Sequence, residues 1–396
     1  MTSELLSRSE AEQERHGYLY TLREIRQQPA TFLDTCERML RRAEDLKRCL
    51  QNVQSVVFTG SGSSEYVGDC VRPAIQRHLK VTCQAIGSGM VLTYGSRALP
   101  PLRPSLMVSL ARSGDSPESV GAVQLLMSRE PEVRHLVVTC NSKGKLATRY
   151  DNDPRVTVVS LDDRTNDRSL VMTSSFTNML VAAWALGFLD APEAYSSLCR
   201  QLSSISENVI GAGFDALSSV GRREFRRAVF LASGSGFGAA REAALKMLEM
   251  TAGRVSTLCE TYLGLRHGPM SYIDRDSLIV CFLSSEPKVR VYETDLLREL
   301  DRKKLGLLKL IAGENVPRDV LRENDVAIDC PGLGTLGDDN ACVVHVVVGQ
   351  LLAFFRCLQE GLRPDSPSEG GVINRVVENF QLHIEGDADL EDPHCR

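Results

Sequence analysis

Short apolar runs alternate with longer amphipathic stretches along most of the chain, starting near residue 55. The runs are rich in valine, isoleucine and leucine, and glycine or serine follows several of them. Such runs are typical of buried strands in a parallel sheet that helices cover on both faces. The pattern predicts strands at 56–58, 81–86, 105–110, 136–140 and 156–161, and again at 228–231, 255–259, 277–283, 305–311 and 326–330.

The order of these elements occurs twice. In each half the first strand leads into a turn rich in glycine and serine, at 59–64 and at 232–238, and then into a helical pattern. A repeated strand–turn–helix unit predicts two tandem, doubly wound α/β domains with parallel sheets. We assign residues 51–190 to the first domain, 191–220 to a helical bridge and 221–363 to the second domain.

The two ends of the chain carry different patterns. Residues 1–50 are mostly polar with a loose apolar stripe, which predicts an N-terminal helical arm. Pro29 should end one helix or begin the next, because proline lacks the N–H that a helix interior needs. Residues 364–396 form a loop-like C-terminal tail with a short apolar end.

Composition narrows the class of protein. The 396 residues carry a net charge of −5 and no basic block, so we predict no nucleic-acid partner. We find no run long and apolar enough to cross a bilayer, and no apolar segment of the kind that a secretory signal needs near the N-terminus. These features predict a cytoplasmic protein without a membrane partner.

Cysteines and histidines give no sign of a metal or disulfide framework. The twelve cysteines contain no C-x-x-C, and most lie in apolar segments, as buried thiols do in a reducing compartment. The seven histidines form no H-x-x-H or H-E-x-x-H. We therefore predict no metal site and no cofactor.

The most informative loop lies between the predicted strand at 105–110 and the helical pattern that follows it. Pro117 suits the first helical position, and Asp115 or Ser116 suits the N-cap. Hydroxyls and free backbone N–H groups at a helix N-terminus also bind anions. The local pattern fits both an ordinary helix cap and an anion site.

The glycine turns allow two kinds of ligand. In the second half, Gly234 to Ala239 fit G-x-G-x-x-A, and Glu260 follows about 20 residues on, as in a nicotinamide dinucleotide site. In the first half Glu65 occupies the third small position, and no acid ends the next strand. That half supplies hydroxyls instead, which suit one compact phosphate: Ser63, Ser64, Ser113, Ser116, Thr173, Ser174 and Ser175.

These motifs resemble those of sugar isomerase (SIS) domains. The isomerase half of glucosamine-6-phosphate synthase has four of them in the same order, here Gly62-Ser63-Ser64, Ser113-Gly114-Asp115-Ser116, Leu245-Lys246-Met247-Leu248-Glu249 and His267-Gly268-Pro269. The chain is more similar to the AgaS-type galactosamine-6-phosphate deaminase/isomerase group (tagatose-6-phosphate ketose/aldose isomerase). That group shares the segments 111–119, 165–169 and 172–176, and Gly371 with 374–377. The likeness runs from about Thr21 to His383.

The resemblance implies two flavodoxin-like SIS domains and assigns roles to single residues. It implies a phosphate site that includes Arg112 beside the serine and threonine hydroxyls named above. Glu249 would act as the base, and Lys246 would stabilise an enediolate oxygen. Glu242 shares their helix face and is expected to pair with Lys246. His267 would open the sugar ring, and in the synthase the matching histidine comes from the neighbouring subunit, so a homodimer or a higher homo-oligomer is expected.

Three departures from the synthase limit the comparison. The chain begins Met1-Thr2 without a nucleophilic cysteine, so glutamine-driven amination is not expected. Ala111 replaces one loop serine, and no lysine follows Lys309, which leaves Arg375 as the nearest tail cation, with an open role. The second half lacks the S-G-[DE]-S loop and has Glu286 there, so we predict one phosphate site per chain.

The predicted function is a phosphosugar deaminase/isomerase. Moving a proton between C1 and C2 of a 2-amino sugar phosphate gives an imine, which water converts to a keto sugar phosphate and ammonia. Galactosamine 6-phosphate and tagatose 6-phosphate are the expected substrate and product. Two alternatives stay open: an aldose–ketose isomerase that releases no ammonia, and a sugar-phosphate sensor without activity.

Overall fold

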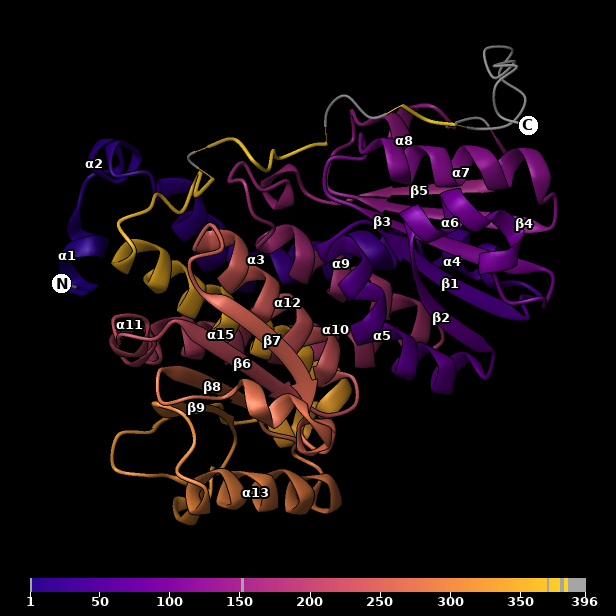
Figure 1. Cartoon of the computed structure of the whole chain (residues 1–396). Coiled ribbons are helices and arrows are strands. Elements are labelled where there is room, and N and C mark those ends of the chain that lie inside the picture. Colours follow the sequence, from indigo (N-terminus) through magenta and orange to yellow (C-terminus); the bar gives the residue numbers. More distant parts are fainter. Residues whose placement is uncertain (1, 151–152, 369, 378–380, 384–396) are drawn as a thin grey trace, which may run out of the picture.

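Two parallel five-stranded sheets form the framework of the molecule (Figure 1). The computed structural model describes residues 2–150, 153–368, 370–377 and 381–383. The first sheet has the order β2-β1-β3-β4-β5 and the second β10-β9-β8-β6-β7. The strands are β1 (Ser55–Gly60), β2 (Thr82–Gly87), β3 (Ser105–Ala111), β4 (Val133–Thr139), β5 (Val156–Ser160), β6 (Arg227–Ala232), β7 (Ser256–Thr261), β8 (Ser277–Phe282), β9 (Leu308–Gly313) and β10 (Val326–Asp329).

The strand orders confirm the predicted α/β class with two doubly wound sheets. Read from its second strand, each sheet has the order 2-1-3-4-5, and all eight strand pairings are parallel. Every strand expected from the apolar runs is present, with its ends shifted by a few residues. The two sheets fall within residues 51–190 and 221–363, whereas the domain limits themselves stay predictions.

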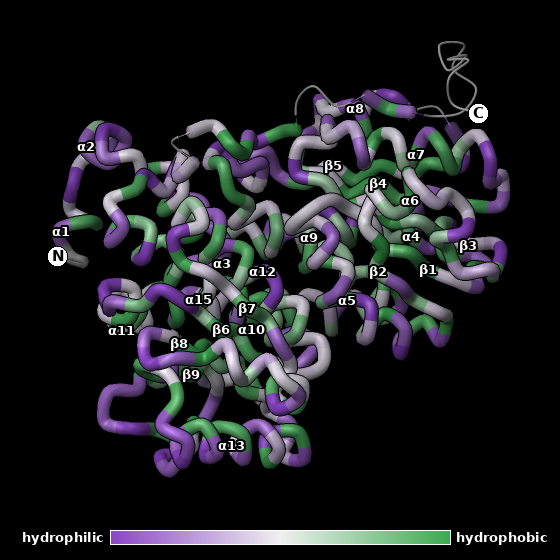
Figure 2. The backbone as a smooth tube through the Cα atoms, viewed as in Figure 1, coloured by the Kyte–Doolittle hydropathy of each residue, from purple (hydrophilic) through white to green (hydrophobic). Residues whose placement is uncertain are grey.

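Helices fill the space between the sheets and cover their outer faces. They are α1 (Thr2–Ser7), α2 (Glu10–Arg15), α3 (Leu19–Arg41), α4 (Ala43–Leu50), α5 (Ser63–Leu79), α6 (Ser88–Tyr94), α7 (Pro117–Arg129), α8 (Lys145–Thr148), α9 (Ser174–Trp184), α10 (Pro192–Ala212), α11 (Phe214–Gly221), α12 (Gly236–Met250), α13 (Pro287–Arg302), α14 (Leu333–Leu336) and α15 (Asp338–Gln359). Apolar residues follow the strands and the central helices (Figure 2).

One hydrophobic core joins the two halves. It contains Phe58 of β1, Val108 of β3 and Phe282 of β8, together with side chains of α3, α9, α10, α12 and α15. Smaller clusters cover the opposite faces of the two sheets. The predicted arm and bridge are therefore not peripheral, because α3 and α10 pack against each other within the layer that separates the sheets.

The central helix α15 was not anticipated from the sequence. It is long and apolar enough to cross a membrane, so the expectation that no run reaches that length is wrong. However, 94% of its most apolar window is buried inside the protein. Gly349 makes room for this burial, because a Cβ there would lie 2.5 Å from the Cβ of Ala243 on α12.

Pro29 does not end a helix, contrary to the prediction. Helix α3 continues through it, from Leu19 to Arg41. The proline leaves the carbonyl of Ile25 without its usual backbone donor. The side-chain amide of Gln28 takes that place, donating to the Ile25 oxygen at 2.9 Å, and so the helix passes the proline with that carbonyl satisfied.

Candidate active site

A cavity of about 330 Å³ opens at the carboxyl ends of β1 and β3. The strand order reverses between these two strands, and open α/β sheets bind ligands at such a point. The turns after both strands, helix α12 of the second half and the C-terminal tail contribute its walls. The lining residues are Ser61, Gly62, Ser63, Ser64, Ala111, Arg112, Ser113, Ser116, Glu118, Ser119, Leu170, Met172, Lys246, Glu249, Ile373, Asn374, Arg375 and Val377.

Two helix N-termini present serines to this cavity. Ser116 is the N-cap of α7 and Pro117 is its first residue, yet the Ser116 side chain makes no capping hydrogen bond. Asp115 is not the cap, because its Oδ1 accepts from the N–H of Lys145 at 2.9 Å. The hydroxyl of Ser113 accepts from the Asp115 N–H at 3.2 Å, which fixes the loop. The loop therefore keeps the N-terminal donors of α7 directed at the cavity.

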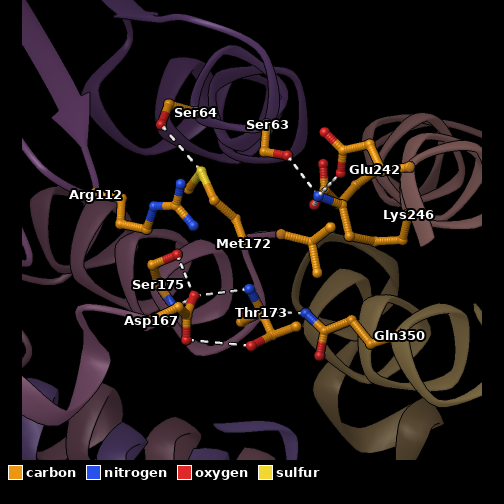
Figure 3. Close-up of polar contacts among 12 residues, drawn as sticks. Ser63, Ser64, Arg112, Asp167, Met172, Thr173, Ser175, Glu242, Lys246 and Gln350 are labelled. Atoms are coloured by element: carbon orange, nitrogen blue, oxygen red, sulfur yellow. Dashed lines mark hydrogen bonds and ion pairs between the residues drawn. The ribbon is translucent and has the colours of Figure 1, made fainter. Parts of the chain in front are cut away.

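The second N-terminus belongs to α5. Gly62 precedes this helix with a φ of +58°, and no side chain caps it. Ser63 and Ser64 begin the helix and are both buried. The Ser64 hydroxyl contacts Sδ of Met172 at 3.8 Å, and the Ser63 hydroxyl accepts from Lys246 Nζ at 3.1 Å. Figure 3 shows the two serines on one side of the site and Lys246 beside Ser63.

Helix α12 supplies a buried charge cluster. Lys246 lies 2.5 Å from Oε2 of Glu249 and 3.3 Å from Oε1 of Glu242, which confirms that the three side chains share a helix face. Gly238 allows the close approach of α12 to α5, because a Cβ there would lie 2.6 Å from Sγ of Cys70. Glu249 lines the cavity with 24% of its side chain exposed, whereas Glu242 is fully buried.

Burial and charge act differently on the members of this cluster. Burial raises the pKa of Glu242 to about 7, against the opposing effect of Lys246. Burial alone would lower the pKa of Lys246, but the carboxylates of Glu242 and Glu249 outweigh it and raise that pKa above its usual value. Lys246 is therefore an ammonium held between two carboxyl groups. This arrangement can donate hydrogen bonds to a developing oxyanion and move a proton through Glu249.

Two arginines form another wall. Arg112 donates to the backbone oxygens of Ser169 and Leu170, at 3.2 and 2.9 Å, and to that of Arg375 at 2.7 Å. Arg375 donates to the backbone oxygen of Asp167 at 2.8 Å and to Oδ1 of Asn166 at 2.5 Å. The 166–170 loop thus positions both guanidinium groups. Arg375 itself belongs to the C-terminal tail.

Helix α3 also holds the 166–170 loop, through the side chain of Glu24. Glu24 accepts from the N–H groups of Arg168 and Ser169, at 2.5 and 3.2 Å, and from the Ser169 hydroxyl. Burial, followed by the nearby charge of Asp167, raises the pKa of Glu24 to about 7. Asp365 at the start of the tail accepts from the N–H of Thr21 at 2.7 Å, so the tail and α3 are joined as well.

Three of the predicted phosphate ligands lie elsewhere. Thr173, Ser174 and Ser175 do not line the cavity. Their N–H groups and hydroxyls all donate to the carboxylate of Asp167, for example from Ser174 Oγ at 2.7 Å and from Ser175 Oγ at 2.5 Å. Figure 3 shows Thr173 and Ser175 beside Asp167. An internal anion already occupies the N-terminus of α9, so the structure does not bring these three residues into the cavity and their role as phosphate ligands stays a prediction.

His267 also lies outside the cavity of its own chain. It is exposed at the end of a short 3-10 helix (Gly264–His267). The other predicted site residues line one cavity together: Ser63, Ser64, Arg112, Ser113, Ser116, Lys246 and Glu249. Glu118, Ser61 and Asn374 also line it but were not anticipated. The segment 111–119 that contains Glu118 did carry the family signature.

In the second half, a carboxylate of the chain itself occupies the position where the equivalent loop would bind an anion. Asp338, the first residue of α15, accepts from the N–H and hydroxyl of Ser285 at 2.7 and 2.8 Å, and from the Ser284 hydroxyl. Its neighbour Asp339 accepts from the hydroxyl of Ser235 in the second glycine turn. These bonds, rather than the expected repulsion by Glu286, fill the anion position. They favour the prediction of one phosphate site per chain.

The fold and the serine-lined cavity together define a sugar isomerase (SIS) domain protein. No known family profile matches the chain. An AgaS protein of Streptomyces coelicolor is 36% identical over 374 residues, covering 92% of this chain and 95% of that protein. D-galactosamine-6-phosphate deaminase AgaS of Escherichia coli O157:H7 is 32% identical over 382 residues, covering 92% and 95%.

A solved structure supports the same assignment. Tagatose-6-phosphate ketose/aldose isomerase of Escherichia coli is 32% identical and superimposes with a TM-score of 0.82, covering 90% of this chain and 96% of that one. The chain belongs to the AgaS family of SIS-domain enzymes. The resemblance drawn from the sequence motifs is thereby confirmed.

Proposed function

We propose that this enzyme converts galactosamine 6-phosphate and water to tagatose 6-phosphate and ammonia. Relatives of this chain are named as galactosamine-6-phosphate deaminase, and a similar solved structure as tagatose-6-phosphate isomerase. The observation that carries the proposal is the position of Lys246 and Glu249 in the same cavity as the serines of α5 and α7. One end of the cavity suits a phosphate, and the other suits proton transfer.

In this proposal the serines hold the substrate's phosphate. Ser64, Ser113 and Ser116 donate to the phosphate oxygens, and the N-termini of α5 and α7 add backbone donors. Arg112 and Arg375 contribute positive charge from the adjoining wall. Ser63 differs from the others, because its hydroxyl already accepts a hydrogen bond from Lys246.

Glu249 would take the proton from C2 of the open-chain aldehyde and return it to C1. The C2–H bond breaks, the electron pair forms the C1–C2 double bond, and Lys246 stabilises the oxygen that gains charge at C1. Reprotonation at C1 leaves an imine at C2. Water adds to that imine, and the C–N bond breaks to release ammonia and the ketone. The same step on a neutral sugar phosphate is an aldose–ketose isomerisation.

Assay of the wild-type enzyme separates the proposed activity from its alternatives. We expect ammonia and tagatose 6-phosphate from galactosamine 6-phosphate, with a lower kcat/KM for glucosamine 6-phosphate. Interconversion of aldose and ketose phosphates without ammonia would identify a plain isomerase. Binding without either reaction would identify a sensor. A coupled ammonia assay and chromatography of the sugar phosphates measure these outcomes directly.

We also propose that the sites are shared between subunits of a homodimer in the cytoplasm. His267 is exposed and outside its own cavity, so a neighbouring chain could bring it to the site as the ring-opening acid and base. None of the eleven cysteines that the structure describes forms a disulfide, which suits a reducing compartment.

Mixed dimers test the shared site. The Glu249→Gln and His267→Gln variants should each be inactive alone. A mixed dimer that contains one subunit of each variant has one intact site, built from the unchanged Glu249 of one subunit and the unchanged His267 of the other. Random subunit mixing should therefore restore about a quarter of the wild-type activity. No recovery in purified mixed dimers would show that His267 acts within its own chain or not at all.

A further inference from the structure

One acid in the cavity has no role in the proposed chemistry. Glu118 is the second residue of α7, two residues after Ser116 of the loop that would hold the phosphate. It lines the cavity, and its Oε2 atom is buried without a hydrogen-bond partner among the described residues. A carboxylate so close to a phosphate site is unfavourable for the phosphate itself. The presence of Glu118 therefore indicates that its carboxylate contacts a group of the ligand other than the phosphate.

A second unpartnered atom lies in the same cavity. The hydroxyl of Ser61, in the turn after β1, is also buried with no partner among the described residues. Strands β1 and β3 are neighbours, so the turn that holds Ser61 and the loop that leads to Glu118 leave the same edge of the sheet. Buried polar groups normally have hydrogen-bond partners. Two buried polar atoms without partners in one binding cavity therefore point to a ligand that supplies the missing hydrogen bonds.

The chemistry of the pair selects the kind of ligand group. An ionised carboxylate only accepts hydrogen bonds, and a serine hydroxyl can accept as well. An ammonium group has three donors and a positive charge, so it meets both needs, whereas a sugar hydroxyl leaves the carboxylate's charge unbalanced. We infer that Glu118, assisted by Ser61, binds the ammonium of an amino-sugar phosphate and so selects amino sugars over neutral ones.

This inference rests on the proposed function for the identity of the ligand, but its test does not need turnover. Two open-chain analogues differ only at C2: 2-amino-2-deoxygalactitol 6-phosphate and galactitol 6-phosphate. Calorimetry on the wild-type enzyme should show tighter binding of the amino analogue. Glu118→Gln should weaken that binding at least about tenfold and change binding of the neutral analogue less than about twofold. Glu132→Gln, an exposed acid beyond α7, is the matched control and should change neither.

The outcomes separate the two ideas. Equal weakening for both analogues would show that Glu118 only shapes the cavity, and unchanged binding would show that it does not face the ligand. Either result overturns the inference. Selective weakening in an enzyme that releases no ammonia would support the inference and refute the proposed activity. Rescue of amino-analogue binding by Glu118→Asp would further separate a charge contact from a structural role.

Discussion

Glu249→Gln should lower kcat for ammonia release by about a thousandfold, within the range that general acid–base catalysis contributes. The amide keeps the size of the side chain and can still accept a hydrogen bond from Lys246, which now lies 2.5 Å from the carboxylate. It cannot take the proton from C2. Because the proposed phosphate donors lie on α5 and α7 rather than on α12, the Kd for substrate should change less than about threefold.

Steady-state kinetics and calorimetry with the inactive variant measure the two quantities. Glu286→Gln is a suitable control, because Glu286 occupies the corresponding loop of the second half and lies outside the cavity. It should leave kcat within about twofold of wild type. Substantial turnover by Glu249→Gln would remove this residue from the mechanism. A large increase in the Kd for substrate would instead show that Glu249 contributes to binding of the substrate in its ground state.

Asp167→Ala should give the largest loss of stability among single substitutions at this site. The carboxylate accepts six hydrogen bonds, from the N–H and hydroxyl groups of Thr173, Ser174 and Ser175, and all four residues are buried. Alanine would leave the six donors without their acceptor. Breaking a buried network of this kind costs on the order of 4 kcal/mol in the free energy of unfolding.

The same substitution should weaken substrate binding through Arg375. Its Nε donates to the backbone oxygen of Asp167, so a displaced loop would move the arginine in the cavity wall. Denaturant unfolding and the KM measure the two effects. Asp163→Ala, an exposed acid on the same segment, should stay within about 0.5 kcal/mol of wild type. A similar small effect for Asp167→Ala would mean that water replaces the carboxylate and that the network adds little.

The sequence pattern predicted the strands well and the central helix not at all. Apolar runs, several of them followed by glycine or serine, located the ten strands found in the described residues, because a strand buried on both faces needs such a run. Helix α15 is buried on every side from Ala341 to Cys357, so it lacks the 3.6-residue period that marks a surface helix. The continuation of α3 through Pro29 depended on the side chain of Gln28, which propensities do not describe.

The site was predicted where the chemistry of a residue is unambiguous. Lys246 and Glu249 share a helix face by spacing alone, and the loop of Ser113 and Ser116 follows a strand. Serines and threonines at a helix N-terminus attract an anion, but the sequence does not say which anion. For 173–175 the anion is Asp167, six residues before the first of them. Sequence motifs identify the hydrogen-bond donors, whereas tertiary contacts decide which anion those donors bind.

The carboxylate of Asp338 in the second half makes the two copies of the repeat respond differently to substrate. The donors of Ser284 and Ser285 are satisfied on folding, so whatever stability they give is present before any ligand arrives. Helix α12 begins at the turn that Asp339 holds, and so the face that carries Lys246 and Glu249 is positioned in the absence of ligand. In the proposed function, the serines of α5 and α7 complete their hydrogen bonding only with substrate. Ligand binding should therefore slow amide hydrogen exchange at the N-termini of α5 and α7 and leave the loop of Ser284 and Ser285 unchanged.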